Sequence, residues 1–551
     1  MSFADESPQA ARATTGRLHA SAPPLAALAV FVLLAIVHTW PLARNPAHVS
    51  RNDTADAVLN TWAIAWVAHQ LPRDPIHLFD ANIFYPERLT LCYSEAMIVQ
   101  GVMAIPIVAA GGSPVLAYNL VLMAGFAFTG WAFCLLARRW TGSWAAGYVS
   151  GSLAAFNAHV LVRLAHLQTQ HVEFVALILF ALDRLVVSRR TRDGVMLGVG
   201  FALQGLTSVY LLVFSTWALV FAVLARAREW LRRKPAEMIG LLTLAGATAT
   251  ILMAPYLLAY YELHLLTGLE RTAADARWYA GSWVDYLSTG SRIHYALWSS
   301  RYYAEAASST FPGLVATALV ALAIAWKETR RDARVQMCLV VAIGCATVSV
   351  LPNTPIYPLL HRTVPLFRAV RVQAHIGQIV LLMIAVVAGF GVAGLGRRWR
   401  NARTWPVVGV ALCMMVNLEA LRAPLGYQPF TEIPPIYDVL ARERGAVVVE
   451  LPFYEPRYFF VNAPYMLNST RHWRPILNGY SGFLPGSYTD VYNAVQSFPD
   501  AASLTALHDR GVTHIVVHAE LFGRDRFDAI ARIASLQPVA ESGDIHIYRL
   551  R

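Results

Sequence analysis

Ser50-Arg51-Asn52-Asp53-Thr54-Ala55-Asp56 opens a long loop that follows the first apolar segment of the chain. The two aspartates of this motif are followed by an amphipathic run that contains Trp62 and Trp66. Then come the segment Asn82-Ile83-Phe84-Tyr85-Pro86 and the pair Ser94-Glu95. Paired acids, an interface-seeking helix and a rigid aromatic–proline turn are an unusual combination between two apolar segments. We therefore expect the rest of the chain to be organised around this loop, and the loop to carry the functional site.

The composition of the 551-residue chain is that of a membrane protein. The chain is 56% hydrophobic and only 14% charged, which is too apolar for a soluble protein. Its net charge is +11, but the arginines form short blocks between apolar runs, which is typical of inner loops and does not indicate a nucleic-acid partner. The five cysteines are scattered, so neither a disulfide framework nor a metal-binding spacing is predicted.

Apolar segments predict about eleven membrane-spanning helices, since about 20 apolar residues cross a bilayer. They are expected near residues 23–40, 114–137, 143–160, 171–188, 194–208, 209–226, 237–260, 311–326, 335–351, 374–396 and 404–423. The first is long for a signal peptide and is predicted to be a retained helix that follows a cytoplasmic tail, residues 1–22. Residues 23–423 then form the transmembrane domain.

Arginine-rich blocks predict the orientation of the chain, because positively charged loops stay on the cytoplasmic side. The blocks are Arg138-Arg139, Arg189–Arg192, Arg226–Lys234, Lys327–Arg334 and Arg397–Arg403. They all fall inside only if residues 96–112 lie along the outer face of the membrane instead of crossing it. The loops predicted outside are then 41–113, 161–170, 261–310, 352–373 and everything after residue 424.

The last part of the chain, residues 424–551, has a different pattern. Short β-branched runs at 446–451, 512–518 and 544–550 alternate with helical patterns at 501–510 and 524–535. This alternation predicts a soluble α/β domain on the outer side. Its segment Asn478–Phe483 combines Gly and Asn with aromatic residues, which suits either the stacking of a sugar or a turn, and the turn is preferred.

The acids of the first loop have two explanations. If a helix begins at Thr54, Asp53 is its N-cap and Asp56 is the acid at the third helical position. Alternatively, one of the two aspartates is a general base for an acceptor hydroxyl, since a helix N-terminus favours an ionised carboxylate. Ser94-Glu95 is either the cap of the next helix, or Glu95 is a second catalytic acid or a group that orients the sugar. A divalent metal held by the two aspartates stays open, and no other cofactor is predicted.

The aromatic residues of the loop also have a structural explanation. Trp62 and Trp66 recur at helical spacing and predict an aromatic belt that anchors a helix at the membrane interface. Residues 82–86, which include Tyr85, predict a rigid turn between two interfacial helices.

Polar residues also gather in the later outer loops. His166 and Gln168 are candidates for contacts to a sugar or an anion, or else for a hydrogen-bonded turn. Arginines on the outer side run against the positive-inside pattern and need a counter-charge, which either acids of the C-terminal domain or a ligand phosphate would supply. These arginines are Arg271, Arg277, Arg292, Arg368 and Arg371, of which the last two are predicted to share a helical face.

Several of these segments resemble bacterial integral-membrane glycosyltransferases of the GT-C superfamily, in particular the dolichyl-phosphate-mannose mannosyltransferase and aminoarabinose-transferase types. The segments are Asp53-Thr54-Ala55-Asp56, Phe84-Tyr85-Pro86, Ser94-Glu95, His166-Leu167-Gln168 and Phe311-Pro312-Gly313. The resemblance covers roughly residues 20–420 and is one of topology and loops. It implies a catalytic base at Asp53 or Asp56, and the two stay alternatives because an Asp-x-x-Asp replaces the Asp-x-Asp of the family.

The resemblance also implies the substrates. A sugar would pass from a polyprenyl-phosphate donor to a glycan, lipid or protein acceptor at the outer face of the bacterial inner membrane. The outer arginines would hold the donor phosphate. His166, Gln168 and Tyr85 are the candidates for contacts to the sugar or the acceptor. Two other classes stay open, namely a non-catalytic envelope-assembly protein and a lipid or polysaccharide transporter. A transporter favours broken helices in two corresponding halves, whereas here the polar residues gather at the outer helix ends.

Overall fold

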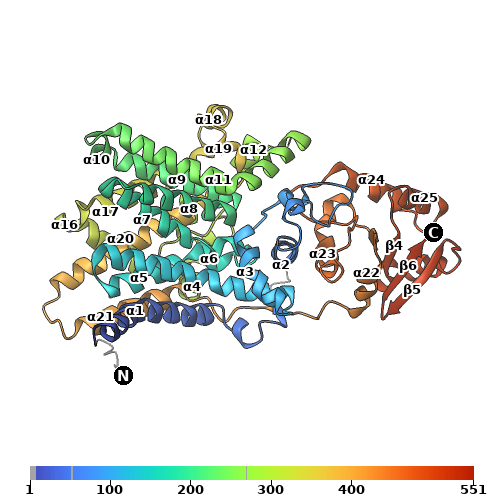
Figure 1. Ribbon diagram of the computed structural model, residues 1–551, viewed down its shortest axis with the longest axis horizontal. Coiled ribbons are helices and arrows are strands. Elements are labelled where there is room, and N and C mark those ends of the chain that lie inside the picture. Colours follow the sequence, from blue (N-terminus) through green and yellow to red (C-terminus); the bar gives the residue numbers. More distant parts are fainter. Residues whose placement is uncertain (1–7, 51–53, 269) are drawn as a thin grey trace, which may run out of the picture.

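The computed structural model describes residues 8–50, 54–268 and 270–551. Figure 1 shows a bundle of long helices at one end and a smaller part that contains the sheet at the other. The helices of the bundle are α1 (Pro8–His38), α4 (Pro114–Thr141), α5 (Trp144–Ala155), α6 (Ala158–Val162), α7 (Glu173–Ser188), α8 (Thr191–Thr207), α9 (Val209–Ala225), α11 (Pro235–Thr267), α15 (Leu314–Ala325), α17 (Ala333–Val350), α20 (Gly377–Arg398) and α21 (Trp405–Ala420).

Among the described residues, five helical segments are long and apolar enough to cross a membrane: Pro114–Thr141, Trp144–Val162, Pro235–Thr267, Ala333–Asn353 and Gln373–Arg398. Shorter apolar helices are Pro23–His38, Ile98–Ala109, Val209–Ala225, Leu314–Ala325 and Trp405–Ala420. The chain is therefore a helical membrane protein. The total number of spans and their orientation stay predictions.

Small residues bring α1, α4 and α5 close together. A Cβ atom on Gly130 of α4 would lie 2.3 Å from the ring of Phe31 on α1, and one on Gly151 of α5 would lie 2.4 Å from the same ring. The three helices can approach this closely only because these positions carry no side chain. This packing fixes the helix ends that surround the site described below.

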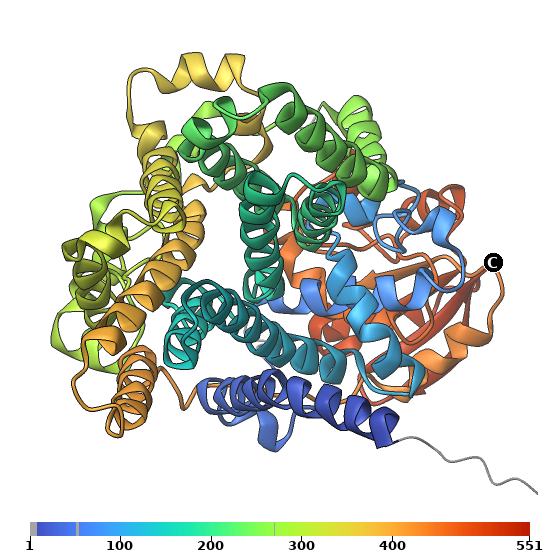
Figure 2. The same ribbon diagram turned by 60° about the vertical axis from the view of Figure 1, so that its left-hand side comes forward.

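The first loop forms two helices, α2 (Ala55–Gln70) and α3 (Ile98–Ala109). With 12 residues, α3 is about 18 Å long, well short of a bilayer core of about 30 Å. Figure 1 and Figure 2 both show the first loop against the C-terminal segment, residues 424–551, and α2 contacts α3, α4 and α23 (Ala463–Ser469).

The predicted aromatic belt on α2 is wrong. Trp62 and Trp66 are only 1% and 5% exposed. The indole of Trp62 donates to the side chain of Asn82 at 3.2 Å, and that of Trp66 donates to the carbonyl of Leu78 at 2.8 Å. Because the rest of the loop and the C-terminal segment cover α2, its tryptophans pack against protein instead of anchoring the helix in lipid.

The C-terminal segment contains a four-stranded sheet with the order β3-β4-β6-β5. Its strands are β3 (Val448–Leu451), β4 (His514–His518), β5 (Leu536–Ser542) and β6 (Ile545–Leu550), and β3 and β4 are parallel while the other pairs are antiparallel. Its other helices are α22 (Asp438–Arg442), α24 (Gly486–Val495), α25 (Ala501–Asp509), α26 (Ala519–Phe522) and α27 (Arg524–Ile530). Strands β3, β4 and β6 overlap the three predicted β-branched runs, whereas β5 was not predicted.

Residues 82–86 contain the predicted turn, which the backbone N–H of Glu87 closes by donating to the carbonyl of Phe84 at 2.9 Å. They run beside residues 476–478 of the C-terminal segment, next to β3. The backbone N–H of Phe84 donates to the carbonyl of Asn478 at 3.1 Å, and that of Tyr85 donates to the carbonyl of Ile476 at 3.0 Å. A short pair, β1 (Val49–Ser50) with β2 (Gln428–Pro429), joins the start of the loop to the same segment.

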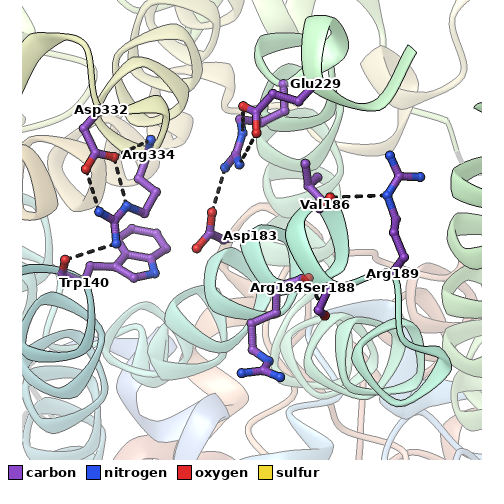
Figure 3. Close-up of polar contacts among 10 residues, drawn as sticks. Trp140, Asp183, Arg184, Val186, Ser188, Arg189, Glu229, Asp332 and Arg334 are labelled. Carbon is purple, nitrogen blue, oxygen red and sulfur yellow. Dashed lines mark hydrogen bonds and ion pairs between the residues drawn. The ribbon is translucent and has the colours of Figure 1, made fainter. Parts of the chain in front are cut away.

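At the opposite end of the bundle, where Figure 1 labels α10 (Ala227–Leu231) and α16 (Lys327–Arg330), Arg184, Arg226 and Arg334 are paired with acids. Figure 3 shows the contacts of Asp183, Glu229 and Asp332, whereas Arg189 there donates to the carbonyl of Val186. Arg226 is 3% exposed and donates to Asp183 at 2.8 Å and to Glu229 at 2.7 Å. Arg184 donates to the buried carboxylate of Asp193 at 2.9 Å. These ion pairs satisfy the charges without any ligand.

Candidate functional site

A cavity of about 680 Å³ lies where the first loop, the ends of several bundle helices and the C-terminal segment meet. The predicted site residues that line it are Asp56, Glu95, His166, Gln168, Arg271, Arg368 and Arg371. They come from α2, from the loop before α3, from the turn between α6 and α7, and from the two loops before α12 (Ala273–Trp278) and α20. Residues distant in sequence thus share one enclosure that has both acidic and basic walls.

Asp56 lies in the first turn of α2, but the predicted cap is wrong. The N-cap is Thr54, whose hydroxyl accepts a hydrogen bond from the N–H of Ala57 at 3.3 Å, so the cap does not use the Asp56 carboxylate. The Asp56 side chain is 43% exposed and lies in the cavity wall. One of its oxygens accepts a hydrogen bond from Tyr480 at 2.6 Å, and the other lies 3.8 Å from Nε2 of His166.

Glu95 does not cap α3, because that helix begins at Ile98 after Met97. Its carboxylate instead accepts a hydrogen bond from the N–H of Val209, at the start of α9, at 2.8 Å. Burial raises the pKa of Glu95 to about 7, while the hydrogen bonds from Val209 and Ser208 oppose this rise. Glu95 is therefore a carboxyl group that exchanges a proton near neutral pH inside the cavity.

The basic wall is formed by Arg163, Arg271, Arg368 and Arg371. Arg368 pairs with Glu270 at 3.3 Å, and its buried Nε has no hydrogen-bond partner. The guanidinium of Arg371 lies over the ring of Tyr279, 5.6 Å from its centroid.

Arg368 and Arg371 do not share the predicted helical face. The helix α19 (Leu366–Ala369) ends before Arg371, and Val370 is extended. Both still reach the cavity. The backbone N–H of Arg271 donates to the carbonyl of Arg368 at 3.4 Å, which holds the two loops together.

His166 and Gln168 lie in the turn that precedes α7. Burial and the nearby Arg163 guanidinium together lower the pKa of His166 to about 4, although the Asp56 carboxylate opposes this shift. His166 is therefore neutral at pH 7. The buried side-chain oxygen of Gln168 has no partner and is available to a hydroxyl or amide donor.

Other predicted residues lie elsewhere. Tyr85 contacts the C-terminal segment as described above and is not in the cavity wall. Arg277 donates to the carbonyl of Pro352 at 3.3 Å, and Arg292 donates to the carbonyl of Arg422 at 3.1 Å, so both serve to join loops. Asp53 lies outside the described residues. Among those that the structure describes, no group of three or more His, Cys, Asp or Glu side chains is placed to hold a metal ion.

Sequence reasoning missed several residues of the wall, namely His159, Tyr210, His375 and Tyr480. The rings of His159 and His375 meet edge to face with centroids 5.2 Å apart. Both histidines lie at ends of apolar segments, where a polar side chain was the available signal. Tyr480 belongs to the loop 478–483, for which a turn was preferred over the stacking of a sugar on its aromatic residues.

A comparison with solved structures identifies the class of fold. No family model and no curated protein matches the chain. The solved structures that match it include an arabinofuranosyltransferase, and the chain shares the fold of that glycosyltransferase. The resemblance predicts a membrane-glycosyltransferase fold, and this match supports it.

The individual matches are distant in sequence. Arabinofuranosyltransferase AftD from Mycobacteria matches with a TM-score of 0.56 and 13% identity over 96% of this chain and 40% of that chain. This chain thus spans well under half the length of AftD. Oligosaccharyltransferase AglB from Archaeoglobus fulgidus matches with a TM-score of 0.47 and 12% identity, over 90% of this chain and 69% of that one. ArnT from Cupriavidus metallidurans, bound to undecaprenyl phosphate, matches with a TM-score of 0.40 and 13% identity, over 96% and 98%.

Proposed function

We propose that this chain is a membrane glycosyltransferase that moves a sugar from a polyprenyl-phosphate donor to an acceptor hydroxyl at the outer face of the bacterial cytoplasmic membrane. The observation that carries the proposal is the cavity, which joins the accessible carboxylate of Asp56 to a wall of arginines. An acid beside an anion-binding wall is what transfer from a sugar phosphate requires. The GT-C fold agrees with this assignment.

The donor would lie against the basic wall. The guanidinium groups of Arg271, Arg368 and Arg371 would bind its phosphate, since the planar fork of arginine matches phosphate oxygens. Leu211 and Phe214 of α9 and Leu263 of α11 also line the cavity, and they give the lipid chain an apolar surface. The negative phosphate and the apolar tail of the donor would thus meet complementary parts of one enclosure.

The chemistry would occur at Asp56. Its carboxylate takes the proton of the acceptor hydroxyl, the acceptor oxygen bonds to the anomeric carbon, and the bond from this carbon to the phosphate oxygen breaks. The polyprenyl phosphate leaves with the bonding electrons, and the arginines stabilise its additional charge. The C-terminal domain, on the outer side, would present the acceptor.

The test is a transfer assay with the full chain in lipid nanodiscs, using radiolabelled polyprenyl-phosphate sugars and envelope acceptors. Asp56→Asn should lower transfer by about 100-fold or more, because a general base typically contributes about 10²–10⁴-fold. Asp74→Asn is a matched control, because Asp74 lies in the same loop outside the cavity and is 44% exposed, against 43% for Asp56. Asp53→Asn, measured in parallel, decides between the two aspartates.

Wild-type activity in Asp56→Asn would remove Asp56 as the base, and loss in Asp53→Asn alone would assign the role to Asp53. If the wild type transferred no sugar from any donor, the proposal that the chain is an enzyme would be wrong. The chain would then be assigned as an assembly factor or a transporter. Transport of labelled lipid across the same nanodisc lipids reconstituted as vesicles would separate those two.

A further inference from the structure

The C-terminal segment lines the cavity as well as covering it. Phe459, Tyr480, Ser481, Gly482 and Leu484 all belong to its wall. We infer that this segment completes the active site, and that Tyr480 is a positioning residue that fixes the Asp56 carboxylate for catalysis. This inference rests on the proposed function. It adds to the active site a residue that lies 424 positions after Asp56 in the sequence.

The contact between Tyr480 and Asp56 is short and directed. The Tyr480 hydroxyl donates to Oδ1 of Asp56 at 2.6 Å. Burial, together with the Asp56 carboxylate, raises the pKa of Tyr480, so the phenol keeps its proton and remains the donor. A hydrogen bond donated to a carboxylate is charge-assisted and favours the ionised form. With Oδ1 held, Oδ2 is the oxygen that faces His166 and the cavity.

Tyr480 is itself held in place by its neighbours. Its backbone N–H donates to the sulfur of Met466 at 3.0 Å, and its ring meets Phe459 edge to face with centroids 5.2 Å apart. A tyrosine immobilised on both sides can fix the direction of a carboxylate. A tyrosine on a loosely held loop could not do so.

The loop that carries Tyr480 is clamped between the sheet and the first loop. The side chain of Asn478 donates to the carbonyl of Glu450 on β3 at 2.9 Å and accepts from its N–H at 2.8 Å. Gly479 packs so closely on Phe84 that a Cβ atom there would lie 2.6 Å from the ring. The position of Tyr480 is therefore set by both halves of the molecule.

The chain contains a matched control for this contact. The Tyr437 hydroxyl donates to the buried carboxylate of Glu450 at 2.8 Å, inside the C-terminal segment. His518 also contacts this carboxylate, at 2.7 Å. Tyr437 and Tyr480 thus form the same chemical pair, but only Tyr480 lines the cavity.

The experiment compares Tyr480→Phe with Tyr437→Phe in the transfer assay. Tyr480→Phe should lower kcat by about tenfold to 100-fold, because a small misplacement of a reacting group costs up to about 10²-fold. The KM for the donor should stay within about twofold. Tyr437→Phe should lower the melting temperature and leave the kcat of the folded protein unchanged.

A second measurement does not depend on transfer. Carbodiimide-coupled labelling of carboxyl groups, read by peptide mass spectrometry, should label Asp56 faster in Tyr480→Phe and at the wild-type rate in Tyr437→Phe. Unchanged labelling in Tyr480→Phe would overturn the contact itself. A wild-type kcat in Tyr480→Phe would overturn the positioning role. If the wild type transfers nothing while labelling still changes, the proposed function fails and the contact stands.

Discussion

The two ends of the helix bundle differ in whether their arginines form ion pairs with acids. At the end shown in Figure 3, buried Arg226 lies between Asp183 and Glu229, and Arg334 donates to Asp332 at 2.9 Å. In the cavity at the other end, Arg163, Arg271 and Arg371 form no ion pair with any residue that the structure describes.

The difference separates structural charges from functional ones. A buried cation whose counter-charge is built into the protein holds helices together and needs nothing else. Cations that line an enclosure without such partners repel one another until an anion enters. We therefore assign the paired end to stability and the cavity end to binding, and the two kinds of arginine should respond differently to substitution.

The largest effect on stability is expected at the paired end. Arg226→Gln leaves the carboxylates of Asp183 and Glu229 without their cation, and it should lower the free energy of unfolding by about 3 kcal/mol. Thermal unfolding in nanodiscs measures this loss. Arg398→Gln is the control, because Arg398 pairs with Glu328 at the exposed surface and should change the melting temperature little. Equal melting of the two variants would contradict the assignment of Arg226.

At the cavity end, substitution should weaken binding and spare stability. Arg371→Gln removes a charged donor from the wall and should raise the Kd for polyprenyl phosphate about tenfold to 100-fold, since a hydrogen bond to a charged group contributes about 1.5–3 kcal/mol. The melting temperature should not fall, because no internal ion pair is lost. Arg277→Gln, an arginine outside the cavity, should bind the lipid as the wild type does. Equal affinity of the two variants would show that the wall does not hold the phosphate.

A smaller effect is expected from Glu95, an acid of the cavity end that has no arginine partner. Its pKa of about 7 lies above the ordinary value of 4.5, so the folded state binds the proton more tightly between these values. Stability should therefore fall as pH rises from about 5 to 7, by about 1 kcal/mol for a partly exposed group. Glu95→Gln should lack this fall. Parallel melting curves of the two proteins across this range would contradict the raised pKa.

Much of this molecule can be predicted from local sequence patterns. The length of the apolar segments identified a membrane protein. Arg271, Arg368 and Arg371 stood out because they are arginines in loops predicted to lie outside, and all three line the cavity. Asp56 was found because short polar motifs stand out against an apolar background. In each case the signal and the residue lie within a few positions of each other.

What failed depends on partners that are far away in the chain. Trp62 and Trp66 have the pattern of an interfacial belt. Nothing near them in the sequence indicates that Trp66 packs against Trp473 of the C-terminal segment. The contact of Tyr480 with Asp56 could not be predicted, because the two residues are 424 positions apart. The cap shifted from Asp53 to Thr54 for a simpler reason, since helix starts are uncertain by one or two residues.

The pairing of residues 82–85 with 476–478 has a consequence for biosynthesis. Asn82 and its partner Ser469 are 387 positions apart. A ribosome that adds about 5–20 residues per second needs about 20–80 s to make the second after the first. Until then residues 82–85 lack their backbone partners, and a C-terminal segment expressed alone would expose an open strand edge beside β3, which favours self-association. This segment is therefore not a module that can be cut off and studied by itself, because its sheet edge is completed by a loop that was synthesised long before it.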